Sequence, residues 1–302
     1  MATEDTMLDI SKGKYWSKAL SLVDGCSPIS EACLNCWLAT TNHRFGKKYH
    51  DNAINFYGKF RTQFTDAQGK WNGKIQFRED RLAIPQRIKK PQVFAIWSDL
   101  YHSAITDEQI IQSYNVMLCH PEHIFLVLTK RIERVASLFP QINNMLIGRL
   151  NHVWHGCTVE TQQRANERIS YLLQVPENKF LSLEPLLSEI DLSKYLKPHW
   201  WECPKCESWS ILEPTYPAIC DCDFPPNKWI QQRDISQVIV GAESGSYRRP
   251  CKIEWIESII QQCKDAKVSV FVKQIHDKHG KVIKDINKFP EDLKRRELAW
   301  QS

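Results

Sequence analysis

The sequence predicts an α/β protein whose parallel strands form a partial or near-closed TIM-like (β/α) barrel. Two observations lead to this fold class: short apolar runs alternate with amphipathic stretches, and polar side chains follow the runs at the same end. Parallel strands that are covered on both faces read as continuous apolar runs, and helices connect them. A chain of 302 residues, 42% hydrophobic and 25% charged, is long enough for one large domain of this kind.

Seven apolar runs are the predicted strands, at residues 19–23, 93–97, 124–128, 153–157, 180–183, 238–240 and 268–272. The amphipathic stretches between them predict helices at residues 107–117, 131–139, 162–173 and 252–266. Thr106 is placed to cap the first of these helices, and Pro250 precedes the last. Strands that alternate with helices in this way are typical of repeated βα units.

Polar groups follow the carboxyl ends of six predicted strands, and they include Ser98, Asp99, Lys130, Arg131, Glu160, Glu184, Glu243, Lys273 and Gln274. Because α/β barrels carry their active sites at this edge, we expect these side chains to line one cavity. For any single strand, a charge that only marks where the strand reaches solvent is the simpler interpretation. Glycines 241 and 245 on either side of Glu243 allow the backbone to approach a ligand closely. The predicted substrate-binding residues are Glu243, Arg248, Lys273 and Gln274.

Three cysteines follow the first predicted strand with the spacing C-x6-C-x2-C: Cys26, Cys33 and Cys36. Three thiolates in one loop can bind three irons of a [4Fe–4S] cluster and leave the fourth iron open to another ligand. Zinc, with His43 or His50 as the fourth ligand, is an alternative, and burial as small apolar side chains is another. The position at a strand end favours the iron–sulfur cluster.

A second group of cysteines lies in an insertion at residues 199–229, which separates residues 1–198 from residues 230–302 of the barrel. The pairs C-x2-C and C-x-C are spaced as in a zinc ribbon and consist of Cys203, Cys206, Cys220 and Cys222. A structural Zn²⁺ is the favoured occupant, and a second iron–sulfur cluster is the alternative. Because the insertion joins the fifth and sixth predicted strands, we expect it to overhang the active face.

The chain has no signal-peptide pattern and no apolar run approaching about eighteen residues, so it is predicted to be cytoplasmic and free of membrane contact. Its formal charge of +5 permits a nucleic-acid partner without requiring one. Residues 41–90 mix aromatic and basic side chains, a composition that suits contact with a base or nucleotide.

From residue 14 to residue 274, apart from the insertion, the chain resembles the phage-associated three-cysteine-motif proteins. That divergent group has a barrel of the radical S-adenosylmethionine (SAM) type. The segments that carry the resemblance are GCSPISEACLNCW, RLAIPQRIKKPQVFAIWSDLYH, VLTKRIER, WHGCTVE, FLSLEPLL, VIVGAESG and VFVKQ. The usual radical SAM loop is C-x3-C-x2-C with an aromatic residue before the last cysteine. Here the first gap has six residues, and Trp37 follows the last cysteine.

The resemblance implies a [4Fe–4S] cluster whose open iron binds SAM, with reductive cleavage that yields a 5′-deoxyadenosyl radical. It implies an electron donor such as flavodoxin or ferredoxin, and the host cytoplasm if the chain is phage-encoded. Asp99 is expected at the amino group of SAM, and Lys130 or Arg131 at its carboxylate. The full set of implied cofactor-binding residues is Trp37, Ser98, Asp99, Lys130, Glu160 and Glu184.

The expected function is therefore a radical SAM enzyme that modifies or isomerises a nucleobase or nucleotide, for example a hypermodified base of phage DNA. Two other classes stay open. One is a non-catalytic zinc-binding nucleic-acid module in which both cysteine groups are structural. The other is a metal-dependent hydrolase on a TIM-like barrel, with Asp99, Glu160 and Glu184 as ligands.

Overall fold

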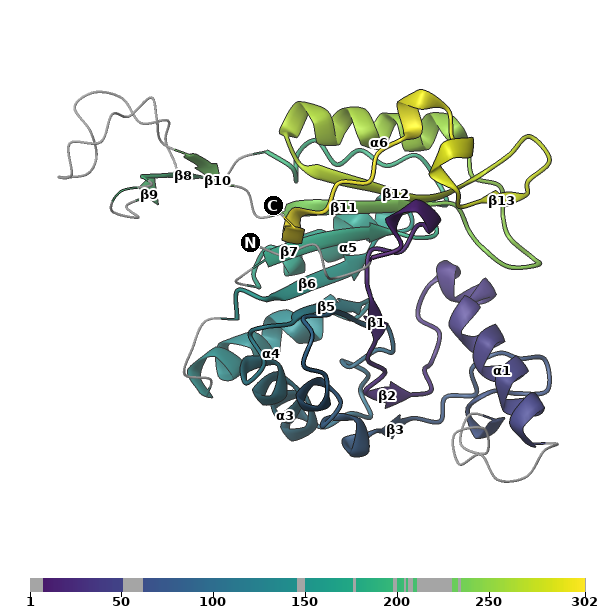
Figure 1. The fold of residues 1–302 in the computed structure, drawn as a ribbon, viewed down its shortest axis with the longest axis vertical. Helices are drawn as coiled ribbons and strands as arrows, with labels where there is room; N and C mark the ends of the chain where they lie inside the picture. Colours follow the sequence, from purple (N-terminus) through teal and green to yellow (C-terminus); the bar gives the residue numbers. More distant parts are fainter. Residues whose placement is uncertain are drawn as a thin grey trace.

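The computed structural model describes residues 8–50, 62–145, 150–175, 178–197, 200–203, 205, 209–210, 230–232 and 235–301. Their centre is a curled, eight-stranded half-barrel sheet in the order β1-β4-β5-β6-β7-β11-β12-β13 (Figure 1). Adjacent strands are parallel except for the last pair, β12 and β13. The strands are β1 Lys18–Ala19, β4 Val93–Ile96, β5 Ile124–Thr129, β6 Val153–Thr158, β7 Asn178–Leu183, β11 Ile235–Gly241, β12 Ser269–His276 and β13 Val282–Ile283.

Four helices cover the outer face of the sheet: α3 Asp107–Leu118, α4 Ile132–Met145, α5 Gln162–Leu172 and α6 Ile253–Ala266. Helix α3 begins as predicted, because the Thr106 side chain accepts a hydrogen bond from the backbone N–H of Gln109 and the Gln109 side chain bonds back to Thr106. Helix α6 buries one stripe against the sheet, formed by Ile256, Ile259, Ile260 and Cys263. No described helix has the length and apolar character needed to cross a membrane.

The inner face of the half-barrel is apolar at the amino ends of the strands and open at the carboxyl ends. Alternate strand residues point inward and form a core cluster with the two chain ends: Tyr15, Val93, Leu126, Trp154, Phe180, Ile239, Phe271, Leu298 and Trp300. A Cβ added at Gly156 would lie 2.2 Å from the Phe180 ring, so this glycine makes room for the phenylalanine. Toward the carboxyl ends Ser182 lines the cavity, and its small side chain leaves space for it.

Six of the seven predicted strands and all four predicted helices are confirmed. The predicted strand 19–23 is only partly correct, because the Leu22 N–H turns back to the Leu20 carbonyl. The chain then forms β2 Val23–Asp24, which pairs with β3 Gln76–Phe77 instead of the main sheet. The short strand β3, strand β13 and helix α1 Trp37–His50, whose sequence is mostly polar and basic, are among the elements that were not predicted.

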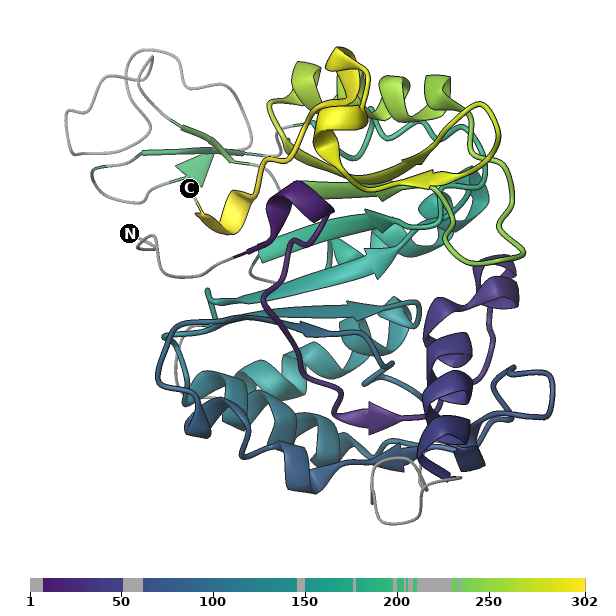
Figure 2. The ribbon, with the colours of Figure 1, turned by 45° about the vertical axis from the view of Figure 1, so that its right-hand side comes forward.

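The insertion and the residues directly after it form a small antiparallel sheet of β8 Trp200–Glu202, β9 Trp209–Ser210 and β10 Ile230–Gln232. Cys203 is buried, but Cys206, Cys220 and Cys222 lie outside the described residues, so the zinc site stays a prediction. The expectation that the insertion overhangs the active face is wrong, since the small sheet lies near the amino end of β11 (Figure 2). Residues 185–197 first run back along the outer face, where the Tyr195 hydroxyl donates to Asn166 of α5.

Because three thiols are buried, we expect the protein to lose stability at high pH. Burial raises the pKa of Cys157, Cys251 and Cys263 to about 12, so these thiols stay protonated in the folded chain after the unfolded chain has ionised. The contribution of these protonated thiols to the free energy of unfolding is complete below about pH 8.5, the ordinary thiol pKa, and is lost as the pH rises toward 12. Urea unfolding of the metal-free protein should show a free energy of unfolding that falls between pH 8.5 and 11. A flat profile would contradict this.

Candidate functional site

A cavity of about 1130 Å³, counted with its open mouth, lies at the carboxyl ends of the strands. The predicted site residues that line it are Cys26, Cys33, Cys36, Trp37, Ser98, Asp99, Lys130, Glu184, Glu243, Lys273 and Gln274. Glu160 and Arg248 do not line it. Glu160 is fully buried and paired with Arg168 of α5 at 2.8 Å, while Arg248 donates to the carbonyls of Gly245 and Gly280.

The three cysteines share one loop, which starts at Gly25 and leads through a short 3₁₀ helix, Glu31–Asn35, into α1. Phe64 and Trp71 are buried behind this loop and pack against Cys26 and Cys36. These two aromatic residues of the 41–90 segment therefore support the cysteines, and Trp71 also lines the cavity.

Gly25 is the residue that sets the path into the loop. Its φ is +88°, and a Cβ there would lie 1.9 Å from the Lys74 carbonyl oxygen. Gly73 offers a matched control, since its φ is +83° but a Cβ would meet nothing within 4 Å. Gly73→Ala should cost only the left-handed strain of about 1–2 kcal/mol. Gly25→Ala should cost clearly more in urea unfolding, and equal losses would contradict this account of the turn.

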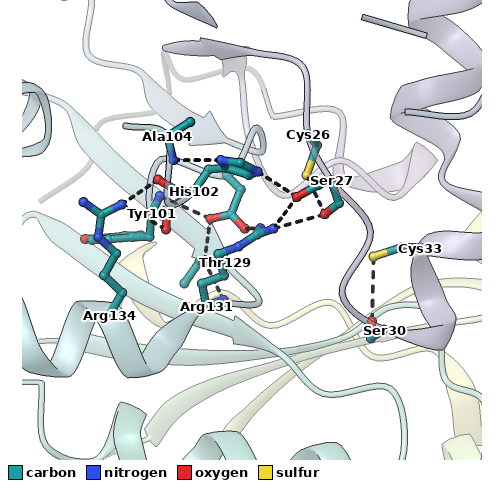
Figure 3. A network of polar contacts seen from close by, with 11 residues as sticks. Cys26, Ser27, Ser30, Cys33, Tyr101, His102, Ala104, Thr129, Arg131 and Arg134 are labelled. Atoms are coloured by element: carbon teal, nitrogen blue, oxygen red, sulfur yellow. Dashed lines mark hydrogen bonds and ion pairs between the residues drawn. The ribbon is translucent and has the colours of Figure 1, made fainter. Parts of the chain in front are cut away.

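The first anchor of the loop is an ion pair between Asp99, after β4, and Arg131, after β5. Figure 3 shows how Arg131 reaches Ser27 of the loop. Asp99 also accepts hydrogen bonds from the Thr129 hydroxyl at 2.7 Å and from the Tyr101 N–H at 3.2 Å. Held in this way, Arg131 donates from Nη2 to the Ser27 carbonyl at 3.1 Å and to the Ser27 hydroxyl at 3.0 Å. The ends of two strands thereby fix the residue next to Cys26.

His102 strengthens this anchor as a neutral imidazole. The Ala104 N–H donates to Nδ1 at 3.1 Å, so the proton lies on Nε2, which contacts the Ser27 hydroxyl at 2.7 Å. Burial, and then the charge of Arg131, lower the pKa of His102 and favour this neutral form.

Two further anchors hold the other half of the loop. Glu243, after β11, binds the Arg249 guanidinium at 2.6 Å, and Arg249 donates to the Glu31 carbonyl at 3.0 Å. Glu243 also accepts from the Asn35 amide at 3.2 Å. The Glu31 carboxylate pairs with Arg164 of α5 at 3.0 Å. The loop is thus tied to four elements of the barrel.

The three thiols line one cavity without converging on a single point. Among the described residues, no three His, Cys, Asp or Glu side chains are grouped to hold one metal ion. Burial, and then the Asp99 charge, raise the pKa of Cys26 to about 12, while Arg131 opposes the shift. His43, a candidate zinc ligand, contacts the Thr65 hydroxyl at 3.2 Å, and the His50 side chain lies outside the described part of the chain.

Sequence reasoning missed Ser27, His102 and Asn35. Ser27 and Asn35 lie between the three cysteines, and this position is the sequence signal from which they could have been predicted. His102 has no such signal, because its partner is 75 residues away in the chain.

The fold and cavity define an α/β protein with a curled, mostly parallel sheet and a cysteine-lined pocket at the carboxyl ends of its strands. The chain belongs to the family described as Protein of unknown function (DUF5131), whose family model matches residues 11–298. The matched range includes every strand of the main sheet and the cysteine loop. No curated protein and no solved structure matched the chain.

Proposed function

We propose that this protein is a radical SAM enzyme in which Cys26, Cys33 and Cys36 bind a [4Fe–4S] cluster at the mouth of a partial TIM-like barrel. One observation carries the proposal: three separate anchors hold the cysteine loop over a cavity of about 1130 Å³. A loop that only buried three apolar thiols would not need these anchors, since Cys26, Cys33 and Cys36 are all partly exposed.

The donor set fits the cluster. A cubane spreads its cysteine ligands over different irons, so thiols that share a cavity but do not converge suit it better than they suit one zinc ion. When bound together, the cluster and SAM supply a 5′-deoxyadenosyl radical for hydrogen abstraction. Lys130 lines the cavity and has no ion-pair partner among the described residues, so it is our choice for the SAM carboxylate.

Asp99 has a role beyond the one that the resemblance implies. Its two carboxylate oxygens are engaged by Arg131, Thr129 and the Tyr101 backbone, so it positions the cysteine loop, and its contact with the SAM amino group stays a prediction. Ser98, Trp37 and Glu184 remain proposed cofactor contacts because they line the cavity.

The proposed substrate is a nucleobase or nucleotide, for example a hypermodified base of phage DNA. Two aromatic rings suited to stacking on a base, those of Trp37 at the start of α1 and Tyr247, are exposed near Asn35, whose amide donates to the Tyr247 carbonyl at 2.7 Å. A flavodoxin or ferredoxin in the host cytoplasm is the proposed electron donor.

The two other classes have less support. A metal-dependent hydrolase needs carboxylates that are free to meet at one ion, whereas Asp99, Glu160 and Glu184 are paired with Arg131, Arg168 and Lys273. A zinc-binding nucleic-acid module needs a fourth ligand at the first cysteine group. His43, the described candidate, contacts the Thr65 hydroxyl through Nδ1, and no metal-holding group of His, Cys, Asp and Glu side chains among the described residues includes it.

The test is anaerobic incubation of the iron-reconstituted, reduced protein with SAM, followed by chromatographic detection of 5′-deoxyadenosine. We expect product only when a reductant is present. A protein that binds iron and sulfide but never cleaves SAM would contradict the proposal.

A further inference from the structure

One wall of the cavity carries polar groups that the cysteine loop does not use. Ser182 lies in β7 and Glu184 directly follows it, Gly241 ends β11, and Lys273 and Gln274 lie in β12. These three strands are neighbours in the sheet, and Gly241 is paired with Gln274. We call these five residues the β7–β12 wall.

Gln274 presents a buried hydrogen-bond acceptor that has no partner within the described residues. Its side-chain amide Nε2 donates to the Ala242 carbonyl at 2.6 Å, and the residue is 4% exposed. This bond fixes the orientation of the amide, because the reversed orientation would place two carbonyl oxygens against each other. The acceptor Oε1 is therefore left without a described partner in a residue that lines the cavity.

Ser182 repeats this feature. It is 1% exposed, lines the cavity, and its hydroxyl has no hydrogen-bond partner in the described part of the chain. A buried polar group without a partner costs about 1–3 kcal/mol. Two such groups in one cavity indicate a ligand that completes their hydrogen bonds.

Lys273 supplies a charged donor in the same cavity. Its Nζ lies 3.0 Å from Glu184 Oε1, and the Tyr15 hydroxyl fixes the other oxygen of Glu184 at 3.0 Å. A Cβ added at Gly241 would lie 3.2 Å from Glu184 Oε1 and 3.4 Å from Gln274 Cγ. The absent side chain at Gly241 thus keeps the wall open between them.

We infer that the β7–β12 wall binds an imide edge, an N–H between two carbonyl groups as in a uracil-type ring. Gln274 Oε1 accepts from the N–H, and the Ser182 hydroxyl and the Lys273 ammonium donate to the carbonyl oxygens. The inference deepens the proposed function and rests on it for the reaction. The binding step itself needs neither a cluster nor SAM.

The experiment compares uridine with 3-methyluridine, in which a methyl group replaces the imide N–H, in ligand-observed NMR titrations of the metal-free full chain. We expect uridine to bind at least about tenfold more tightly, because 3-methyluridine leaves the Gln274 acceptor unpaired. Equal affinities, or no binding of uridine at millimolar concentration, would overturn the inference.

Two variants test whether the β7–β12 wall causes the preference for uridine over 3-methyluridine. Ser182→Ala removes a hydroxyl that has no partner, so it should keep its melting temperature while uridine binding weakens. Gln274→Met should bind both nucleosides alike, whereas the surface control Gln261→Met should keep the wild-type preference. If both wall variants retain that preference, another surface binds the imide. A chain that discriminates the nucleosides but never cleaves SAM would contradict only the proposed reaction.

Discussion

Replacing Cys33 with alanine is expected to abolish iron binding while the fold stays intact. Two remaining thiolates cannot hold a cubane, and no other described Cys, His, Asp or Glu is grouped with them to substitute. Cys33 is partly exposed, and the one hydrogen-bond contact of its thiol within the described residues is to the Ser30 hydroxyl, at 3.8 Å. The free energy of unfolding of the metal-free protein should therefore change by less than about 1 kcal/mol.

The measurement is iron content after anaerobic reconstitution, with Cys119→Ala as the control. Cys119 is exposed at the end of α3 and does not line the cavity, so that variant should bind as much iron as the wild type. We expect the same loss for Cys26→Ala and Cys36→Ala. Equal iron content in Cys33→Ala and the wild type would refute the ligand assignment.

Arg131→Ala is expected to have the second largest effect, on both stability and iron retention. The side chains of Arg131 and Asp99 are 12% and 9% exposed, so the substitution leaves a carboxylate buried without its partner. Breaking a buried pair in this way costs about 3–5 kcal/mol. The same change releases Ser27, so Cys26 loses its fixed position.

Urea unfolding and iron content should both be measured, with the exposed Arg87→Ala as a control for loss of an arginine. Arg87→Ala should change the unfolding free energy by less than about 0.5 kcal/mol. If Arg131→Ala destabilised the chain but held its iron as firmly as the wild type, the anchor would serve the fold alone.

The strand positions could be predicted because buried parallel strands leave continuous apolar runs, and the runs at 93–97, 124–128 and 153–157 match β4, β5 and β6 closely. The end of the first strand was harder to predict, because Leu22 is buried like a strand residue although its N–H turns back to the Leu20 carbonyl. Helix α1 was missed because its polar sequence has no clear apolar stripe.

The site was predictable at the level of the sheet edge but not at the level of the contacts. Glu184 and Glu160 both follow strands, yet only Glu184 reaches the cavity while Glu160 pairs with Arg168 behind it. The anchors join residues 104 and 218 positions apart, as in Arg131 with Ser27 and Arg249 with Glu31. Pairs at such separation leave no periodic trace in one sequence.

The most direct test of the central claim is the composition and spectrum of the anaerobically reconstituted protein. Iron and acid-labile sulfide should each reach about four per chain, and the electron paramagnetic resonance spectrum of the reduced protein should change when SAM is added, because SAM binds the open iron. One zinc per cysteine group without sulfide, or a spectrum that SAM leaves unchanged, would contradict it.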